Sequence, residues 1–186
     1  MWVHESFTNY AENLYVEYYY GKDAGSEYVS GTRGNIKNDR PIIGIYNVNY
    51  EGSGDMYYKG GNMLHTLRQI INDDEKWRGI LRGLNKDFYH KVVKGSQIEN
   101  YLSEKTGMDL KPFFAQYLRD IRIPVFEYFI KGDNLSFRWN NCVPGFEMPL
   151  KIYVSGKEKY ITPKTGFTSV KLDTINAAIL VDPGYY

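Results

Sequence analysis

Few side chains in this sequence can bind a metal or activate water. The histidines and the cysteine are His4, His65, His90 and Cys142. Zinc-dependent hydrolases commonly place two histidines four residues apart on one helical face, in the pattern H-E-x-x-H. The sequence begins this pattern at His4 and departs from it at Thr8. Because a zinc site takes at least three protein ligands, the residue types alone predict no complete zinc-hydrolase site.

Two carboxylates near the start of the sequence could act together. Glu5 and Glu12 are seven residues apart, which places them within about 20° of each other on a helical wheel. Roughly opposite them is an apolar stripe at helical spacing, made of Phe7, Tyr10, Ala11, Leu14, Tyr15 and Tyr18. A solvated helix face explains such a pair, whereas the apolar residues around Glu5 favour a functional role. Both interpretations stay open on this evidence.

Other classes of site and partner find no support in the sequence. We find no phosphate-binding Walker loop, no G-x-S-x-G elbow and no dinucleotide fingerprint. The 23 basic and 22 acidic residues leave a net charge of +1, which gives no reason to expect nucleic acid as a partner. No apolar run approaches the roughly 20 residues of a membrane span, and no signal peptide is recognisable. A single cysteine excludes an internal disulfide.

Helical spacing dominates residues 1–123. The first predicted helix ends near Gly21, and four more begin near residues 56, 74, 96 and 109, which makes about five helices. Ser96 with Glu99 predicts a capping box at the fourth helix. Residues 22–55 are rich in Gly, Asn, Asp and Ser and predict a long ordered loop, with one extended piece at Ile42–Tyr46.

The hydrophobic period changes from 3.6 to 2 after Pro124. Val125–Lys131 and the alternating residues 135–139 predict a hairpin across Gly132-Asp133-Asn134. Further short strands are predicted at residues 150–154, 159–162, 168–172 and 178–181. The predicted fold class is therefore α+β, with a helical subdomain over residues 1–123 followed by a small antiparallel β-sandwich over residues 124–186.

Two segments resemble motifs of the aminopeptidase N-like zinc metallopeptidases. Residues 2–12, Trp-Val-His-Glu-Ser-Phe-Thr-Asn-Tyr-Ala-Glu, resemble W-[LI]-[NH]-E-G-F-[AT]-x-[YW]-x-E, with Ser6 in the place of the usual Gly. Residues 57–68, from Tyr57 to Arg68, resemble Y-x-K-G-x-x-x-L-x-x-L-R. Between them, Asn38–Gly44 looks like a loop of bacterial members. The resemblance covers the helical part well and the β part more loosely.

The resemblance implies roles for three residues. Glu5 matches the third zinc ligand, and Tyr57 matches the residue that stabilises the tetrahedral intermediate. Glu12 would orient a ligating imidazole, and a solvated helix charge is an equal alternative for it. The implied cofactor is zinc, and the implied substrate is a peptide that loses its N-terminal residue.

The H-E-x-x-H helix of this family has no counterpart in the sequence. We therefore expect a C-terminal fragment of a gluzincin aminopeptidase that is inactive by itself, with its zinc site unoccupied unless the parent enzyme is complete. Uncovered helix faces would then favour self-association. The alternative is a non-catalytic module that binds peptide or glycan through an aromatic-rich surface, since the sequence has 18 tyrosines. The compartment is not assigned, and both the bacterial cytoplasm and the periplasm stay open.

Overall fold

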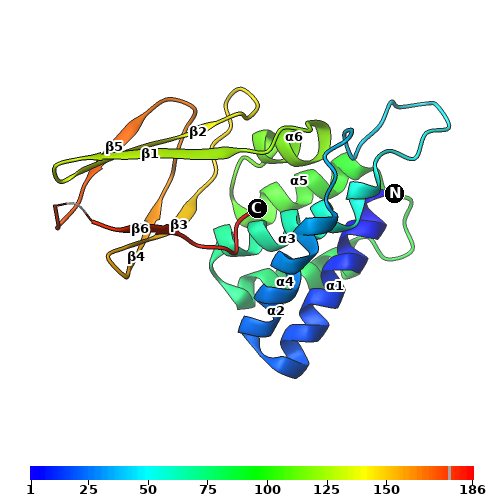
Figure 1. The fold of residues 1–186 in the computed structure, drawn as a ribbon. Coiled ribbons are helices and arrows are strands. Elements are labelled where there is room, and N and C mark those ends of the chain that lie inside the picture. Colours follow the sequence, from blue (N-terminus) through cyan, green and yellow to red (C-terminus); the bar gives the residue numbers. More distant parts are fainter. Residues whose placement is uncertain (176) are drawn as a thin grey trace. The chain divides into compact units, whose positions relative to one another are not determined.

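The computed structural model describes residues 1–175 and 177–186, which form two compact units. One unit holds Met1–Ile121 with Gly184–Tyr186, and the other holds Arg122–Pro183. Within the described residues, six α-helices are followed by six β-strands (Figure 1). The predicted α+β fold, with helices first and sheets second, is confirmed. The sandwich arrangement and the predicted domain roles stay predictions.

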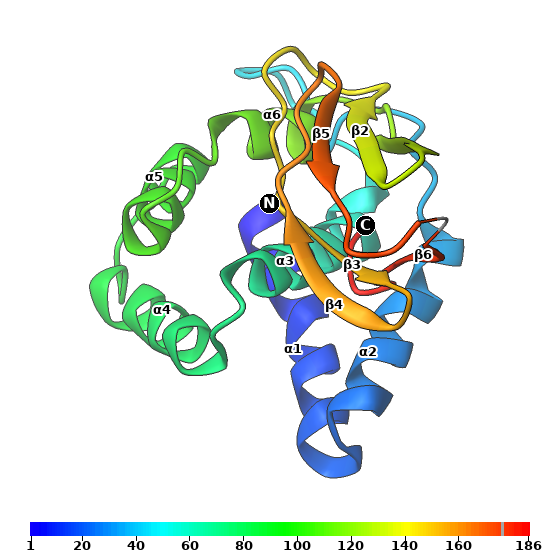
Figure 2. The ribbon, with the colours of Figure 1, turned by 90° about the vertical axis from the view of Figure 1, so that its left-hand side faces the viewer.

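Helix α3 is the centre of the helical unit, since eleven of its fourteen residues are buried. The helices are α1 (Trp2–Tyr20), α2 (Lys22–Gly31), α3 (Tyr58–Ile71), α4 (Asp74–Asp87), α5 (Gly95–Thr106) and α6 (Lys111–Arg119), with single 3-10 turns η1 (Thr32–Asn35) and η2 (Gly54–Met56). Helix α1 packs against both α2 and α3, and α4 lies beside α5 (Figures 1 and 2). The packing of α1 on α3 brings the two sequence motifs together.

Helix α2 occupies the start of the segment predicted as a loop, so that prediction is wrong over residues 22–35. The cause is tertiary. Gly25 lies so close to α1 that a Cβ at this position would be 2.8 Å from the Cβ of Glu17. A glycine that permits this approach also lowers helix propensity, so the local composition pointed to a loop.

The segment between η1 and η2 has no regular structure in the residues described, so the extended piece predicted at Ile42–Tyr46 is also wrong. Ile42 is nevertheless buried, and the Ile43 N–H donates to the carbonyl of Leu118 at 2.9 Å. The buried side chain of Ile42 and the hydrogen bond from Ile43 to Leu118 thus hold this part of the loop near the end of α6, although no strand pairs with it.

Helix α1 buries a different face from the one that its apolar spacing predicted. Its buried residues are Trp2, Ser6, Tyr10 and Asn13. Ala11, Tyr15 and Tyr18, which belong to the predicted apolar stripe, are exposed instead. The buried face is narrow and partly polar because α3 presents small and polar residues to it, among them Gly60 and His65.

The predicted capping box of Ser96 and Glu99 is wrong by two residues. Lys94 is the N-cap of α5, and its backbone N–H donates to the side-chain oxygen of Gln97 at 2.8 Å. Glu99 forms an ion pair with Arg119 at 2.8 Å instead. A helix start read from sequence is uncertain by a residue or two, because several neighbouring polar residues can cap it.

The second unit contains two antiparallel sheets of three strands. The strands are β1 (Val125–Lys131), β2 (Asn134–Asn140), β3 (Leu150–Val154), β4 (Lys157–Ile161), β5 (Thr168–Lys171) and β6 (Ile179–Val181), in the orders β1-β2-β5 and β4-β3-β6. The predicted hairpin is present, and it turns through Gly132 at a φ of 65°. Leu135, Phe137 and Trp139 of β2 are buried on one face, in keeping with the predicted period of two.

Candidate functional site

Glu5 and Tyr57 meet in the structure although they are far apart in the sequence. Glu5 lies in the first turn of α1, and Tyr57 is the N-cap of α3, directly after η2. The charge of Glu5 is the largest cause that raises the pKa of Tyr57 above its ordinary value, followed by loss of hydration and by the hydrogen bond from the phenol to Glu5. Tyr57 is 41% exposed, so the pair is open to solvent.

The turn that carries Tyr57 is anchored by the buried carboxylate of Asp55. This carboxylate accepts the backbone N–H groups of Lys37 at 2.9 Å and Asn38 at 2.7 Å. Ser53 caps η2 by accepting from the Asp55 N–H at 3.2 Å, and its hydroxyl donates to Asp39 at 2.8 Å. These bonds fix η2, and with it the start of α3, against the preceding loop.

Lys59 is a buried cation two residues after Tyr57. Its side chain is almost fully enclosed, and Nζ donates to the backbone carbonyl of Asp120 at 3.0 Å. Burial lowers the pKa of Lys59, while the charges of Asp55 and Asp120 act in the opposite direction. Lys59 thereby ties the start of α3 to the end of α6.

Glu12 lies on α1 and is held by α2. The Tyr28 hydroxyl donates to Glu12 Oε2 at 2.8 Å, and this hydrogen bond is the largest cause that raises the pKa of Tyr28. Asn9 Nδ2 donates to the same oxygen at 3.4 Å. Glu12 is exposed on α1, and both of its predicted roles stay predictions.

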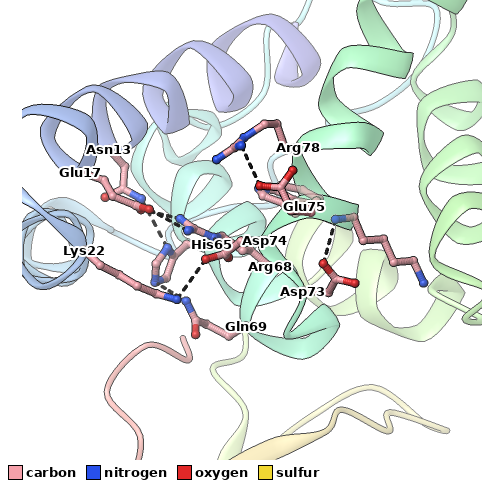
Figure 3. Close-up of polar contacts among 12 residues, drawn as sticks. Asn13, Glu17, Lys22, His65, Arg68, Gln69, Asp73, Asp74, Glu75 and Arg78 are labelled. Atoms are coloured by element: carbon pink, nitrogen blue, oxygen red, sulfur yellow. Dashed lines mark hydrogen bonds and ion pairs between the residues drawn. The ribbon is translucent and has the colours of Figure 1, made fainter.

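A polar cluster around the buried guanidinium of Arg68 fixes the other half of α1 (Figure 3). The Arg68 guanidinium donates to both carboxylate oxygens of Glu17, at 2.5 and 2.8 Å, and to Asp74 at 2.8 Å. Lys22 of α2 reaches the second oxygen of Asp74 at 3.1 Å. The hydrogen bond from Arg68 is the main cause that lowers the pKa of Asp74 to about 2. This cluster joins four helices, α1 to α4.

His65 is buried close to the same polar cluster (Figure 3). Its Nδ1 lies 3.4 Å from Asn13 Nδ2, and its Nε2 lies 3.1 Å from Gln69 Nε2 (Figure 3). With both ring nitrogens next to amide groups, His65 is a partnered core residue. Among the residues that the structure describes, no three His, Cys, Asp or Glu side chains are grouped so that they could hold a metal ion.

Spacing did not reveal the residues of the polar cluster. In the sequence, Arg68 is only the last position of a motif and Asp74 only the start of a predicted helix, and no pattern singles out Glu17 or Lys22. The one available clue was a charged residue on the face of α3 that also carries Leu64 and Leu67, because a charge in an apolar stripe is buried only when it is paired.

An open groove of about 820 Å³ runs along another side of α1. Val3, Phe7, Ala11 and Leu14 line it from α1, and Leu81 and Leu84 line it from α4. Glu5, Glu12 and Tyr57 are not among its lining residues. Part of the predicted apolar stripe, Phe7, Tyr10, Ala11 and Leu14, therefore lines a groove that the described residues leave open.

The sequence is similar to parts of several aminopeptidases. It is 29% identical over 128 residues to the probable aminopeptidase 1 of Sulfurisphaera tokodaii, which is 65% of this chain and 16% of that protein. It is 25% identical over 108 residues to the leucyl aminopeptidase of Saccharolobus solfataricus, 54% of this chain and 14% of that one. It is 30% identical over 83 residues to aminopeptidase N of Lactococcus lactis, 45% of this chain and 10% of that one. No protein-family model matches the chain.

The fold is also that of a solved aminopeptidase. The crystal structure of Legionella pneumophila aminopeptidase A in complex with aspartic acid matches 94% of this chain and 22% of that one, with a TM-score of 0.67 and 14% sequence identity. The resemblance to aminopeptidases indicated by the two motifs is thus confirmed. The chain spans no more than 16% of the length of these curated relatives.

Proposed function

We propose that this chain forms part of a zinc metalloaminopeptidase of the gluzincin type, which removes N-terminal residues from peptides. The observation that carries the proposal is the contact between Glu5 and Tyr57, because two separate motifs deliver an anionic ligand and a phenol donor to one place. The names of the relatives support a peptidase origin. The helical unit supplies the frame for this contact, through the anchors on η2 and α3.

The described residues fit one zinc ligand and do not fit a whole zinc site. Glu5 offers a carboxylate of the kind found in His₂Glu sites, and no further two ligands lie beside it in the described part of the chain. The proposal therefore assigns the remaining ligands and the general base to parts of a longer enzyme. It follows that this chain by itself neither retains stoichiometric zinc nor hydrolyses peptides.

Tyr57 is the proposed oxyanion donor. Its phenol O–H would donate to the carbonyl oxygen of the scissile peptide as negative charge develops there, a contribution commonly worth about 3 kcal/mol. A tyrosine keeps its proton at neutral pH, and the neighbouring charge of Glu5 raises the pKa of Tyr57 further, so the phenol can donate. Tyr58, the next residue, is half-buried at the start of α3 and has no assigned role.

A chimera tests this proposal. The helical unit of this chain, residues 1–121, replaces the corresponding helical segment of Lactococcus lactis aminopeptidase N, chosen by modelling that enzyme on this fold, and the host supplies the H-E-x-x-H helix expected in that family. We expect zinc-dependent hydrolysis of an aminoacyl p-nitroanilide, and Tyr57→Phe should lower kcat by about 10²- to 10³-fold. Tyr58→Phe is the matched control and should leave kcat unchanged. A chimera that binds zinc and loses no activity on Tyr57→Phe would contradict the proposal.

A second candidate is a non-catalytic module that binds peptide or glycan. It is favoured by one observation, the exposed tyrosines at the end of α1, where Tyr15 and Tyr19 have ring centroids 4.7 Å apart and Tyr18 and Tyr19 are 5.0 Å apart. Clusters of exposed aromatic rings are typical of surfaces that bind other molecules. Glycan-array binding that is lost on Tyr19→Ala would move the assignment to this candidate.

A further inference from the structure

Ser6 links the segment that carries Glu5 to the segment that carries Tyr57. It directly follows Glu5 on α1 and is fully buried. Its hydroxyl donates to the backbone carbonyl of Met56 at 2.7 Å, and Met56 directly precedes Tyr57. One hydrogen bond therefore spans from the residue after Glu5 to the residue before Tyr57.

The packing around Ser6 leaves little freedom for either helix to shift. A Cβ at Gly60 would lie 2.0 Å from Ser6 Oγ and 2.6 Å from Ser6 Cβ. One residue further along, a Cβ at Gly61 would lie 2.3 Å from Asn9 Oδ1. Because α3 has no side chain at these two positions, Ser6 and Asn9 of α1 pack directly against its backbone.

The direction of the Ser6 hydrogen bond sets it apart from ordinary helical packing. A serine hydroxyl inside a helix usually bonds the carbonyl three or four residues earlier in the same helix. Ser6 instead reaches a carbonyl of η2, fifty residues away. The glycine that the resembled motif carries at this position has no hydroxyl, so this bond depends on the serine of the present chain.

We propose that Ser6 is a positioning residue, which holds the start of α1 in register with the turn before Tyr57 and so keeps Glu5 and Tyr57 in contact. The role of Ser6 in catalysis rests on the proposed function. The contact between Glu5 and Tyr57 is present in this chain without zinc or substrate, so the test needs neither.

The test uses the intact chain labelled with carbon-13 at tyrosine Cζ and observed by NMR at neutral pH. Tyr57→Phe assigns the Tyr57 signal, and Glu5→Gln gives its position when the charge of Glu5 is absent. We expect Ser6→Ala to move the Tyr57 signal toward that position, since the contact with Glu5 is loosened. The matched control is Ser103→Ala on α5, where the hydroxyl donates to the Glu99 carbonyl at 3.0 Å. It should leave the Tyr57 signal in place.

The outcomes separate this inference from the proposed function. Ser6→Gly, which removes the hydroxyl and cannot clash with Gly60, serves as the second variant in case Ser6→Ala does not fold. A folded Ser6 variant whose Tyr57 signal stays unmoved, while Glu5→Gln moves it, would overturn the positioning role and leave the proposed site intact. A Tyr57 signal that does not respond to Glu5→Gln would overturn both, because the two residues would then not meet.

Discussion

Arg68 is a buried charged residue whose removal should lower the stability of the chain. Its side chain is 5% exposed and bonds Glu17 and Asp74. Arg68→Met would leave the Glu17 carboxylate in a largely enclosed position without its cation, so the free energy of unfolding should fall by about 3–5 kcal/mol. Urea unfolding measures this loss.

The matched control for Arg68 is Arg78→Met on α4. Arg78 bonds Glu75 at 2.8 Å, and both side chains are more than half exposed (Figure 3). An exposed pair of this kind contributes about 0–1 kcal/mol. Equal losses in the two variants would show that the Arg68 cluster is no stronger than a surface ion pair.

Because of Asp74, we expect the folded chain to lose stability in acid. Its pKa is lowered in the folded chain from 3.8 to about 2, chiefly by the hydrogen bond from Arg68. A lowered folded pKa contributes stability that is complete above the unfolded value and is lost as the pH falls from 3.8 through about 2. Asp74→Asn should flatten the decline of the urea midpoint over this range.

Asp23→Asn on the exposed side of α2 is the control for this acid effect, and it should keep the pH dependence of the parent chain. The measurement is a series of urea unfolding curves at falling pH. If the parent chain and Asp74→Asn lose stability in parallel between these pH values, the Asp74 carboxylate is not the group responsible.

At the scale of elements, the contact between α1 and α3 depends on glycine. Gly60→Ala would place a Cβ 2.0 Å from Ser6 Oγ, so the helices must separate, and we expect a loss of about 1–3 kcal/mol. Gly79→Ala on α4 is the matched control, because no atom lies within 4 Å of a Cβ there.

Gly79→Ala should raise stability by about 0.5–1 kcal/mol through helix propensity alone. Thermal and urea unfolding of both variants give the comparison. A Gly60→Ala chain as stable as Gly79→Ala would mean that α1 and α3 tolerate a wider spacing, and that the contact of Glu5 with Tyr57 is less tightly fixed than the structure implies.

At the scale of the whole molecule, the uncovered apolar stripe of α1 predicts self-association. Phe7 and Leu14 line the open groove. A second copy packed along this stripe would cover these apolar side chains. We therefore expect light scattering to show a mass that rises with concentration.

Leu14→Glu should shift this association toward the monomer, since it places a charge in the apolar groove. Tyr46→Glu is the control, because Tyr46 is 78% exposed on the loop between η1 and η2 and does not line the groove. If the chain without substitutions stays a monomer at high concentration, the prediction of self-association is refuted. Among the described residues, no helix is both long enough and apolar enough to cross a membrane.

The sequence alone determined the elements whose signal is local. The change of hydrophobic period at Pro124, the β1–β2 hairpin and the apolar face of α3 were all predictable, because a repeat of 2 or 3.6 residues is visible without any partner. The motifs around Glu5 and Tyr57 could likewise be recognised from their residue types and spacing.

Tertiary structure alone decided which face of α1 is buried and that residues 22–31 form a helix. It also supplied the contact between Glu5 and Tyr57, which the sequence implied only through the resemblance. The face of α1 was misread because its apolar stripe is wider than the surface that α3 offers, and the glycines of α3 accept the small Ser6 side instead. Helix α2 is stabilised by its close approach to α1 at Gly25, against its own propensity. Contacts between residues far apart in the sequence leave no periodic trace, so only the folded chain reveals them.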